Sequence, residues 1–290
     1  MITYVKRKTL EIKENGRSSD YITPSFIHGC LFKCVYCTMR RNKPHGLSIA
    51  TNVDEILNVI ENHAIIADVK KPNQTHPTFI TYDLSCNEDF SLHIKYHEWE
   101  KIFDFFKNSP RIMGTFATKY VNEKLLSYNP EKKIRIRYSL MPQQLSSILE
   151  PNTSLISERI KAINDFHSAG YDVHINFSPI LINNETNDLY IDLYKELFQE
   201  VNDVVKDEIK KDVMAECIML THNKKMHQLN LIENPEAEKL LWNPNIQEDK
   251  ISSYGSQNIR YKWNLKNKYV KDFIKLHDEI IPWNKIRYIF

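Results

Sequence analysis

Short apolar segments alternate with amphipathic segments along most of the chain, and this alternation restricts the fold more than any other feature. Segments rich in β-branched and aromatic residues predict six strands, at 22–27, 77–84, 111–118, 133–140, 171–179 and 213–220. Patterns of helical period predict five helices, at 53–65, 97–108, 120–128, 157–170 and 188–205. Strands that alternate with helices form a parallel sheet with right-handed crossovers. The predicted fold is α/β, an open, partial (β/α)6 TIM-like barrel, which suits 290 residues better than a closed eightfold barrel.

Three regions follow from this pattern: an N-terminal segment at 1–20, the barrel at 21–221, and a C-terminal extension at 222–290 that contains a β-hairpin. Residues 251–290 carry eight Lys and Arg side chains against three acidic ones, interleaved with aromatic residues. Basic side chains neutralise phosphates and aromatic rings stack on bases, so this composition predicts a nucleic-acid surface. A solvated face over a small aromatic core accounts for the same composition equally well.

The chain contains no apolar run of the roughly 20 residues needed to span a bilayer, and its first residues lack the apolar core of a signal peptide. Five cysteines, an odd number with three of them within eight residues, do not resemble a secreted disulfide framework. We expect a cytoplasmic protein that does not bind membranes, take it to be a monomer, and expect the clustered cysteines to serve metal binding or redox chemistry.

The stretch HGCLFKCVYCTMRR at 28–41 places Cys30, Cys34 and Cys37 directly after the first predicted strand. Zinc sites usually take four protein ligands in two separated pairs, and the sequence has no second CxxC pair. Disulfide oxidoreductases use one CxxC pair and need no further thiol. Three thiolates can bind a [4Fe–4S] cluster and leave one iron open for an external ligand. A zinc-binding nucleic-acid module without catalysis is the alternative from a different class of protein.

Polar and sulfur-containing side chains also follow the next three predicted strands. Cys86 comes after the second strand, Lys119 after the third, and Ser139 ends the fourth. Functional groups collect at the carboxyl ends of parallel strands. We therefore expect these side chains to meet the cysteine cluster on one face of the barrel.

The Cx3CxxC spacing in this position resembles the radical S-adenosylmethionine (SAM, AdoMet) superfamily, and Tyr36 fits the aromatic residue that these proteins have directly before the last cysteine. The segments 82–90, 116–120, 135–180 and 258–263 resemble the spore photoproduct lyase family. The similarity runs in matching order from about residue 20 to residue 270, most of the chain. It implies a [4Fe–4S] cluster on Cys30, Cys34 and Cys37 whose remaining ligand is the methionine end of SAM.

This resemblance implies a DNA-repair lyase. In that family the reduced cluster cleaves SAM to a 5′-deoxyadenosyl radical, which abstracts hydrogen from the spore photoproduct, a thymine lesion, and lets the bridging C–C bond break. Cys86 matches the hydrogen donor of the family, and a buried structural cysteine is the alternative for this residue. Lys119 and Ser139 match positions that hold the SAM carboxylate. The family also implies an electron donor such as flavodoxin or ferredoxin.

Arg260, Tyr261 and Lys262 lie in a segment that resembles the hairpin with which this family enters the lesion. The resemblance implies that all three bind DNA and that Tyr261, like Tyr36, has a catalytic role near the extruded base. A plain amphipathic edge strand is the alternative for these residues. Thr38 stands where the family has a second tyrosine that relays hydrogen with the first. A radical SAM enzyme that modifies another nucleic-acid base or a protein is therefore an alternative function.

Three further residues have simpler interpretations. Cys217 lies inside a predicted apolar strand and is expected in the core. His222 and His227 have no thiol or carboxylate at a metal-binding spacing, so we expect no second metal site there.

Overall fold

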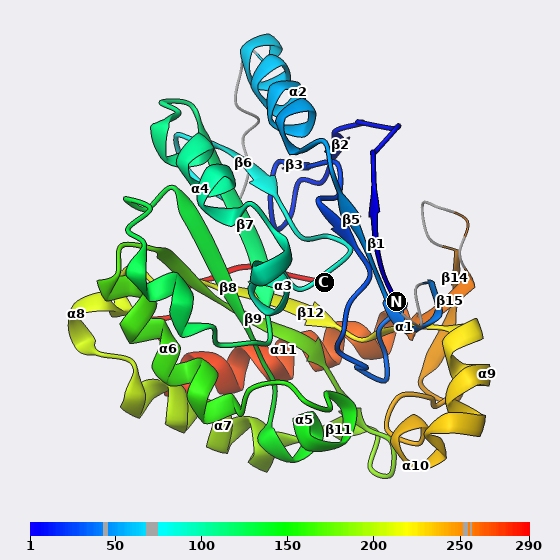
Figure 1. Ribbon diagram of the computed structural model, residues 1–290. Helices are drawn as coiled ribbons and strands as arrows, with labels where there is room; N and C mark the ends of the chain where they lie inside the picture. Colours follow the sequence, from blue (N-terminus) through cyan, green and yellow to red (C-terminus); the bar gives the residue numbers. More distant parts are fainter. Residues whose placement is uncertain (43–45, 68–74, 252–254, 256) are drawn as a thin grey trace.

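The computed structural model describes residues 1–42, 46–67, 75–251, 255 and 257–290. Its main layer is a curled, eight-stranded sheet in the order β16-β12-β9-β8-β7-β6-β3-β2 (Figure 1). In that order the strands are β16 (Ile286–Ile289), β12 (Ala215–Met219), β9 (Asp172–Ile180), β8 (Ile134–Leu140), β7 (Ile112–Thr118), β6 (Ile80–Asp83), β3 (Tyr21–Ile22) and β2 (Lys13–Glu14). All neighbours from β16 to β3 pair in parallel, so the predicted open α/β barrel is confirmed.

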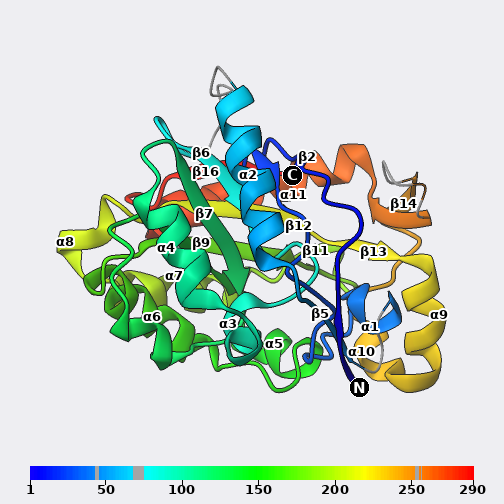
Figure 2. The same ribbon diagram turned by 45° about the horizontal axis from the view of Figure 1, so that its top comes forward.

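Helices pack around the outside of this sheet and beside the small sheet that contains the C-terminal hairpin (Figure 1, Figure 2). The longer ones are α2 (Val53–Ile66), α4 (Trp99–Asn108), α6 (Ile156–Ser168), α7 (Ile191–Val204), α9 (Lys224–Glu233) and α11 (Trp263–Ile280). The shorter ones are α1 (Met39–Asn42), α3 (Phe90–His93), α5 (Gln143–Leu149), α8 (Asp207–Lys210) and α10 (Pro235–Glu238), with 3-10 turns η1 (Ile94–Tyr96) and η2 (Glu123–Ser127). In the part of the chain that the structure describes, no helix is long and apolar enough to cross a membrane.

Smaller sheets flank the barrel. One consists of β1 (Ile2–Val5), β5 (Leu47–Ala50) and β4 (Ile27–His28), and a second of β10 (Ile182–Asn183) and β11 (Asp188–Leu189). A third consists of β13 (Thr221–Asn223), β15 (Gln257–Tyr261) and β14 (Gln247–Ile251). Since β14 and β15 pair antiparallel, they form the hairpin predicted for the C-terminal extension.

Charged and apolar residues alternate along β8, and the two sets serve opposite faces of the sheet. On the outer face Tyr138 packs edge-on against Phe166 of α6, with ring centroids 5.7 Å apart. On the inner face Arg137 lies 2.6 Å from Asp83 on β6 and 3.2 Å from Glu216 on β12. Burial opposes the charge of Arg137, but the two carboxylates outweigh it and raise the pKa of the guanidinium. Buried ion pairs therefore join three strands across the inside of the barrel.

The structure differs from the prediction in several segments. The strand predicted at 22–27 is divided into β3 and β4, with Pro24, which cannot donate to a sheet, between them. The helix predicted at 120–128 is the shorter 3-10 turn η2. Helix α11 was not predicted, because its many basic residues obscured the helical spacing of the buried ones. Tyr269, Phe273 and His277 are buried at a spacing of four residues.

The C-terminal strand β16 was also missed, and it ties the two ends of the curled sheet together. It pairs with β12, and Arg287 Nη2 donates a hydrogen bond of 3.1 Å to the carbonyl of Arg17, in the turn between β2 and β3. The Arg17 guanidinium lies 3.6 Å from the centroid of the Phe290 ring. Residues 222–290 thus contribute to the barrel itself, and the boundary at residue 221 stays a prediction.

Candidate active site

The three clustered cysteines lie on the loop between β4 and α1, and backbone hydrogen bonds hold this loop from two sides. The Val35 N–H donates to the carbonyl of Leu149, at the end of α5, at 2.8 Å. The Gly29 N–H donates to the carbonyl of Asn87, in the loop after β6, at 3.0 Å. The loop is therefore fixed to two strand-end segments of the barrel.

One cavity of about 320 Å³ brings the predicted groups together. Its wall contains Cys30, Cys34 and Cys37 from the cysteine loop, together with Tyr36. Cys86, Lys119 and Ser139 join them from the ends of β6, β7 and β8, as expected from the strand positions. The remaining lining residues are Phe32, Met39, Asp83, Ser85, Glu88, Asp89, Ala117, Thr118, Arg137, Asn176 and Ile218.

Two thiols of the cysteine loop, those of Cys30 and Cys34, need a nearby cation to become thiolates. Burial raises the pKa of the Cys30 thiol to about 12, and the Asp89 carboxylate adds to the rise. Burial, followed by Glu150, raises the pKa of Cys34 well above its usual value. Among the residues that the structure describes, no three His, Cys, Asp or Glu side chains could hold a single metal ion. A [4Fe–4S] cluster needs no such convergence, since each thiolate binds a different iron.

Glu150, which sequence analysis missed, is a buried carboxylate at which four side chains of the site meet. It accepts hydrogen bonds from the Tyr36 hydroxyl, from Arg159 Nη1 at 3.0 Å and from Ser146 Oγ at 3.2 Å. Its Oε1 lies 3.9 Å from Lys119 Nζ. Because the side chains of Glu150 and Arg159 are both 0% exposed, each charge depends on the other for its stability.

Lys119 provides a fixed cation in the cavity wall. Its backbone N–H donates to Asp89 Oδ2 at 2.8 Å, and its ammonium lies 5.8 Å from the centroid of the Tyr36 ring. Burial opposes the charge of Lys119, but Glu150, Cys34 and Asp89 together outweigh burial and raise the pKa of the ammonium. The residue is thus positioned to pair with a carboxylate of a ligand.

Two buried oxygens in the cavity wall have no hydrogen-bond donor within the described ranges, namely Glu88 Oε1 and Asn176 Oδ1. Asn176 Nδ2 donates to Ser139 Oγ at 3.3 Å, which orients the amide. Buried acceptors of this kind are usually satisfied. A ligand that brings N–H or O–H groups into the cavity would satisfy both.

His93 connects Glu88 to the cysteine loop. The Leu31 N–H donates to His93 Nε2 at 3.2 Å, which assigns the ring proton to Nδ1 and makes it the donor to Glu88 Oε2 at 3.1 Å. His97 Nε2 lies 2.9 Å from the same oxygen. Burial opposes the charge of Glu88, but the two histidines outweigh burial and lower the pKa of the carboxyl. This series of hydrogen bonds positions the backbone next to Cys30. Sequence analysis missed it.

Cys86 lies between the first cavity and a second cavity of about 350 Å³. The second is lined by Thr9, Glu11, Lys13, Ile22, Thr23, Pro24, Ser25 and Asn87, and the wall of each cavity includes Cys86. Although Cys86 is exposed, the surrounding protein desolvates its thiol and raises the pKa to about 11, with Asp83 adding to the rise and Arg137 opposing it. The sulfur therefore carries its hydrogen at neutral pH.

The hairpin residues predicted to bind the lesion do not line the cavity. Tyr261 is buried, and its hydroxyl accepts a hydrogen bond from the Ile182 N–H at 3.1 Å. Lys262 Nζ donates to a backbone carbonyl at 2.8 Å, and Arg260 Nε lies 3.0 Å from Glu248 Oε1. Tyr261 has a packing role, so its position lends no support to the predicted catalytic role. The DNA-binding roles of Arg260 and Lys262 stay predictions.

Asn230 on α9 ties the C-terminal extension to the cysteine loop. Its Nδ2 donates to the Val35 carbonyl at 3.0 Å and to Glu238 Oε2 at 2.6 Å. Glu238 also lies 3.0 Å from His222 Nε2 and 2.6 Å from His227 Nδ1. These histidines therefore have a carboxylate partner after all, which sequence analysis missed because it comes from the next helix.

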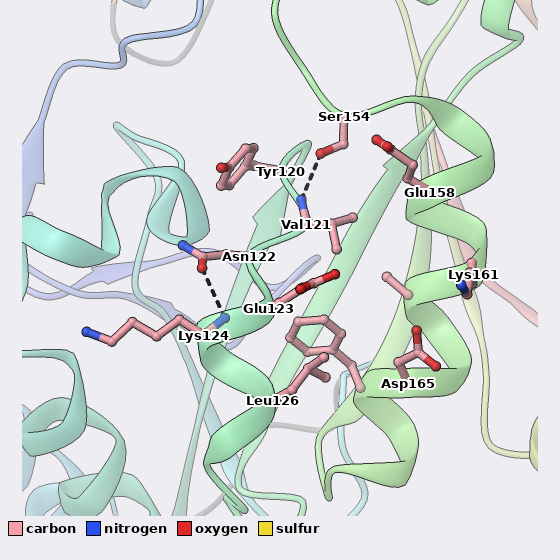
Figure 3. A pocket seen from close by; sticks show the side chains of 12 residues that line it. Tyr120, Val121, Asn122, Glu123, Lys124, Leu126, Ser154, Glu158, Lys161 and Asp165 are labelled. Atoms are coloured by element: carbon pink, nitrogen blue, oxygen red, sulfur yellow. Dashed lines mark hydrogen bonds between the residues drawn. The ribbon is translucent and has the colours of Figure 1, made fainter.

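A larger cavity of about 610 Å³ lies between η2 and α6 and carries different chemistry (Figure 3). Figure 3 shows Glu158, Lys161 and Asp165 along one side, and a hydrogen bond of 3.0 Å from the Val121 N–H to Ser154 Oγ. None of the cysteines lines it. We therefore assign the candidate active site to the smaller cavity, because of the chemistry of its lining side chains and not because of its volume.

A parallel, open barrel with a Cx3CxxC loop and three strand ends in the wall of one cavity defines a protein of the radical SAM class. A model of the spore photoproduct lyase family matches residues 2–290. The chain belongs to the spore photoproduct lyase family.

Curated relatives match part of this chain. The spore photoproduct lyase of Bacillus subtilis is 28% identical over 189 residues, which is 63% of this chain and 52% of the relative. That of a Geobacillus species is 24% identical over 179 residues, which is 60% of this chain and 50% of the relative. The match to this chain thus spans about half the length of these relatives.

Solved structures match the whole chain. A spore photoproduct lyase complexed with dinucleoside spore photoproduct has a TM-score of 0.85 at 20% identity and covers 100% of this chain and 82% of that chain. A spore photoproduct lyase mutant with bound AdoMet and dinucleoside spore photoproduct has the same TM-score, identity and coverage. This likeness confirms the fold.

Proposed function

We propose that this protein is a radical SAM lyase that repairs a spore photoproduct-type thymine lesion in DNA, with Cys86 as the hydrogen donor. One observation carries the proposal: the thiols of the Cx3CxxC loop and the Cys86 thiol line the same cavity. Radical repair needs both within reach of one substrate, because the donor must quench the radical that the cofactor creates. Family membership, and the relatives solved with dinucleoside spore photoproduct, support this substrate.

The cysteine loop fits a [4Fe–4S] cluster. Cys30, Cys34 and Cys37 would bind three irons as thiolates and leave the fourth iron to the methionine end of SAM. Binding would release the protons that burial holds on the sulfurs of Cys30 and Cys34. When bound, the cluster supplies an electron, and SAM supplies the 5′-deoxyadenosyl radical that takes a hydrogen atom from the lesion.

The other walls of the cavity fit the polar groups of SAM. Lys119 offers a cation to the SAM carboxylate, and Ser139 offers a hydroxyl nearby. The oxygens of Glu88 and Asn176 that lack donors suit the ammonium and hydroxyl groups that SAM also carries. We assign cofactor binding to these four residues.

Cys86 would transfer its sulfur-bound hydrogen atom to the carbon radical of the opened lesion, which completes the product and leaves a thiyl radical on sulfur. Its pKa of about 11 keeps this hydrogen in place at neutral pH. We assign Tyr36 to the return of a hydrogen atom to that sulfur, and the phenoxyl radical left on Tyr36 would then take a hydrogen atom from 5′-deoxyadenosine. Burial and the Glu150 carboxylate raise the pKa of the Tyr36 hydroxyl well above its usual value, so the phenol stays protonated.

The proposed reaction also implies partners. Reduction of the cluster needs a one-electron donor, for which we infer a protein such as flavodoxin or ferredoxin. A monomer in the cytoplasm, where thiols stay reduced, suits such a cluster.

Anaerobic reconstitution with iron and sulfide, followed by dithionite and SAM, tests this function. We expect a brown protein that forms 5′-deoxyadenosine and that restores thymines from a dinucleoside spore photoproduct. Cys86→Ala should abolish repair, whereas Cys217→Ala should retain it, because Cys217 is a buried thiol of the same sheet outside the cavity wall. A reconstituted cluster that never cleaves SAM contradicts the radical chemistry, and repair by Cys86→Ala contradicts the donor assignment.

Thr38 supports a second candidate, the same radical chemistry on another nucleic-acid base, because its aliphatic hydroxyl cannot relay hydrogen as a phenol does. Mass spectrometry of products from irradiated DNA and from undamaged DNA and RNA separates the two. A new modified base without thymine recovery would favour the second candidate.

A further inference from the structure

Four cationic side chains from three separate segments gather beside the hairpin. They are Arg17 in the turn between β2 and β3, Lys250 on β14, Arg260 on β15 and Lys266 near the start of α11. Figure 2 shows β2, α11 and β14 toward the same side of the molecule. Burial lowers the pKa of the Lys266 ammonium, and the like charges of Lys250, Arg260 and Arg17 lower it further. Lys266 is therefore close enough to each of the other three cations to be affected by its charge.

The register of the hairpin puts Lys250 and Arg260 on one face. Arg260 is directly opposite Glu248, and Lys250 lies two residues from Glu248 on the same strand. Side chains in opposite positions, or two residues apart on one strand, lie on the same face of a sheet. Ile259 and Tyr261 occupy the other face and are buried, so the two cations are on the outer face.

Arg17 is exposed, but contacts with the C-terminal strand fix its position. Its carbonyl accepts the 3.1 Å hydrogen bond from Arg287, and its guanidinium lies over the Phe290 ring at 3.6 Å. A guanidinium over an aromatic ring can still donate from its edge, in the geometry that suits a phosphate. Arg17 is therefore held in place with donors available for an anion.

One carboxylate offsets this charge. Glu248 Oε1 lies 3.0 Å from Arg260 Nε, with side chains 36% and 39% exposed. In the described part of the chain, no other acidic side chain forms an ion pair with Arg17, Lys250 or Lys266. The surface keeps an excess of positive charge that a bound anion would offset.

An exposed aromatic ring lies near these cations. Trp263 is 65% exposed at the start of α11, three residues before Lys266, a spacing that places neighbours on a helix surface. Phosphate-binding cations beside an exposed ring fit a nucleic-acid strand better than a free phosphate ion.

We propose that Arg17, Lys250, Arg260 and Lys266 form a surface that binds the backbone phosphates of the DNA strand whose lesion enters the cavity. The identity of the bound strand, DNA that carries the lesion, rests on the proposed function. The surface adds to that function a set of contacts with the strand outside the cavity. It differs from the predicted DNA contacts because it includes residues of the N-terminal segment and of α11. Lys262 is left out, since its ammonium donates to a backbone carbonyl.

Fluorescence anisotropy of the reconstituted protein with a labelled, undamaged DNA duplex tests this surface. The double variant Arg17→Gln/Lys266→Gln should reduce the slope of log affinity against log salt by about two, and reduce affinity at low salt about tenfold or more. Lys275→Gln is the matched control, an exposed cation of α11 that lies 3.9 Å from Glu279, and should keep the slope. Glu248→Gln should strengthen binding about twofold or more, because it removes the carboxylate that competes with phosphates.

A wild-type slope in the double variant overturns the proposal, as does an equal loss in Lys275→Gln or weaker binding by Glu248→Gln. Since Glu248→Gln is expected to gain affinity, partial unfolding cannot imitate the expected result. The assay contains neither lesion nor SAM, so its outcome is independent of repair. A protein that binds DNA through this surface and repairs no lesion would refute the proposed function and leave the surface in place.

Discussion

Glu150→Gln tests how the active site is held together. The Glu150 carboxylate is 0% exposed and lies 3.0 Å from Arg159 Nη1 and 3.9 Å from Lys119 Nζ. Gln keeps the shape and one acceptor oxygen but removes the charge, which leaves the buried Arg159 with neutral acceptors such as the Ser139 carbonyl at 2.8 Å. Removing one charge of a buried pair costs about 3–5 kcal/mol. Because Gln retains part of the hydrogen bonding, we expect the free energy of unfolding to fall by about 3 kcal/mol.

Urea denaturation of the reduced protein, followed by circular dichroism, measures this loss. With an m value of about 3 kcal/mol/M, the midpoint should fall by about 1 M. The matched control is Glu158→Gln on α6, whose carboxylate accepts a hydrogen bond from the Leu155 N–H at 2.8 Å at an exposed helix start and should cost about 1 kcal/mol or less. A Glu150→Gln midpoint no lower than that of the control would refute the reasoning. The same variant should also bind less iron, because Lys119 and Tyr36 lose their common partner.

Three further predictions concern Cys86, His174 and Asn230. The pKa of about 11 leaves Cys86 with roughly a hundredfold less thiolate than an ordinary cysteine, so alkylation by iodoacetamide, followed by mass spectrometry, should be slow at pH 8 and rise about tenfold per pH unit up to pH 10. A plateau in that rate below pH 9 would contradict the assignment. Burial, followed by Arg135, lowers the pKa of His174 to about 4. Below about pH 6.5 the unfolded chain therefore binds a proton that the folded protein does not bind. His174 therefore stabilises the fold above about pH 6.5. Between pH 7 and pH 5, urea titrations should show that the free energy of unfolding falls by on the order of 2 kcal/mol more in the wild type than in His174→Gln. Equal decreases in the two proteins would contradict this prediction. Asn230→Ala removes the side chain that donates to the Val35 carbonyl, so the reconstituted protein should lose iron to a chelator faster than wild type, and Gln228→Ala, on the exposed side of the same helix, should not.

Sequence reasoning predicted which side chains would meet because parallel strands end at one edge of a sheet. Cys86, Lys119 and Ser139 were each chosen as residues at a strand end, and all three line the cavity with the cysteine loop. Errors in the starts of strands did no harm: β6 begins at Ile80 and not at 77, yet its end and the loop that carries Cys86 are where the pattern placed them. The ends of strands, marked by a change from apolar to polar residues, are what such a prediction depends on.

Contacts between segments that are far apart in the sequence could not be predicted from the sequence. Tyr36 and Glu150 are 114 residues apart, and Asn230 and Val35 are 195 residues apart. No periodicity or spacing connects such pairs, because a hydrogen bond across the fold depends on where whole elements come to lie. The residues that hold the cysteine loop therefore came only from the structure.

Composition and period gave opposite answers for the last part of the chain. Basic and aromatic residues at 251–290 predicted a nucleic-acid surface, while the spacing of Tyr269, Phe273 and His277 belongs to a helix that packs on the barrel. The two interpretations are compatible, since one helix can bury its aromatic side and expose its lysines, and the nucleic-acid surface stays a prediction. The charge count alone could not tell which aromatic residues of this segment are exposed. Trp263 is 65% exposed.

The C-terminal extension completes the barrel and also connects its surface to its interior. Arg287 and Tyr288 of β16 lie 3.0 and 2.8 Å from Glu216, whose side chain is 0% exposed. Glu216 in turn pairs with Arg137, and Arg137 pairs with Asp83 in the wall of the cavity beside Cys86. Because Arg287 also holds the Arg17 turn, the same buried charges position both the proposed phosphate-binding surface and the proposed hydrogen donor. DNA bound at the proposed surface would therefore be held at a fixed distance from the proposed hydrogen donor.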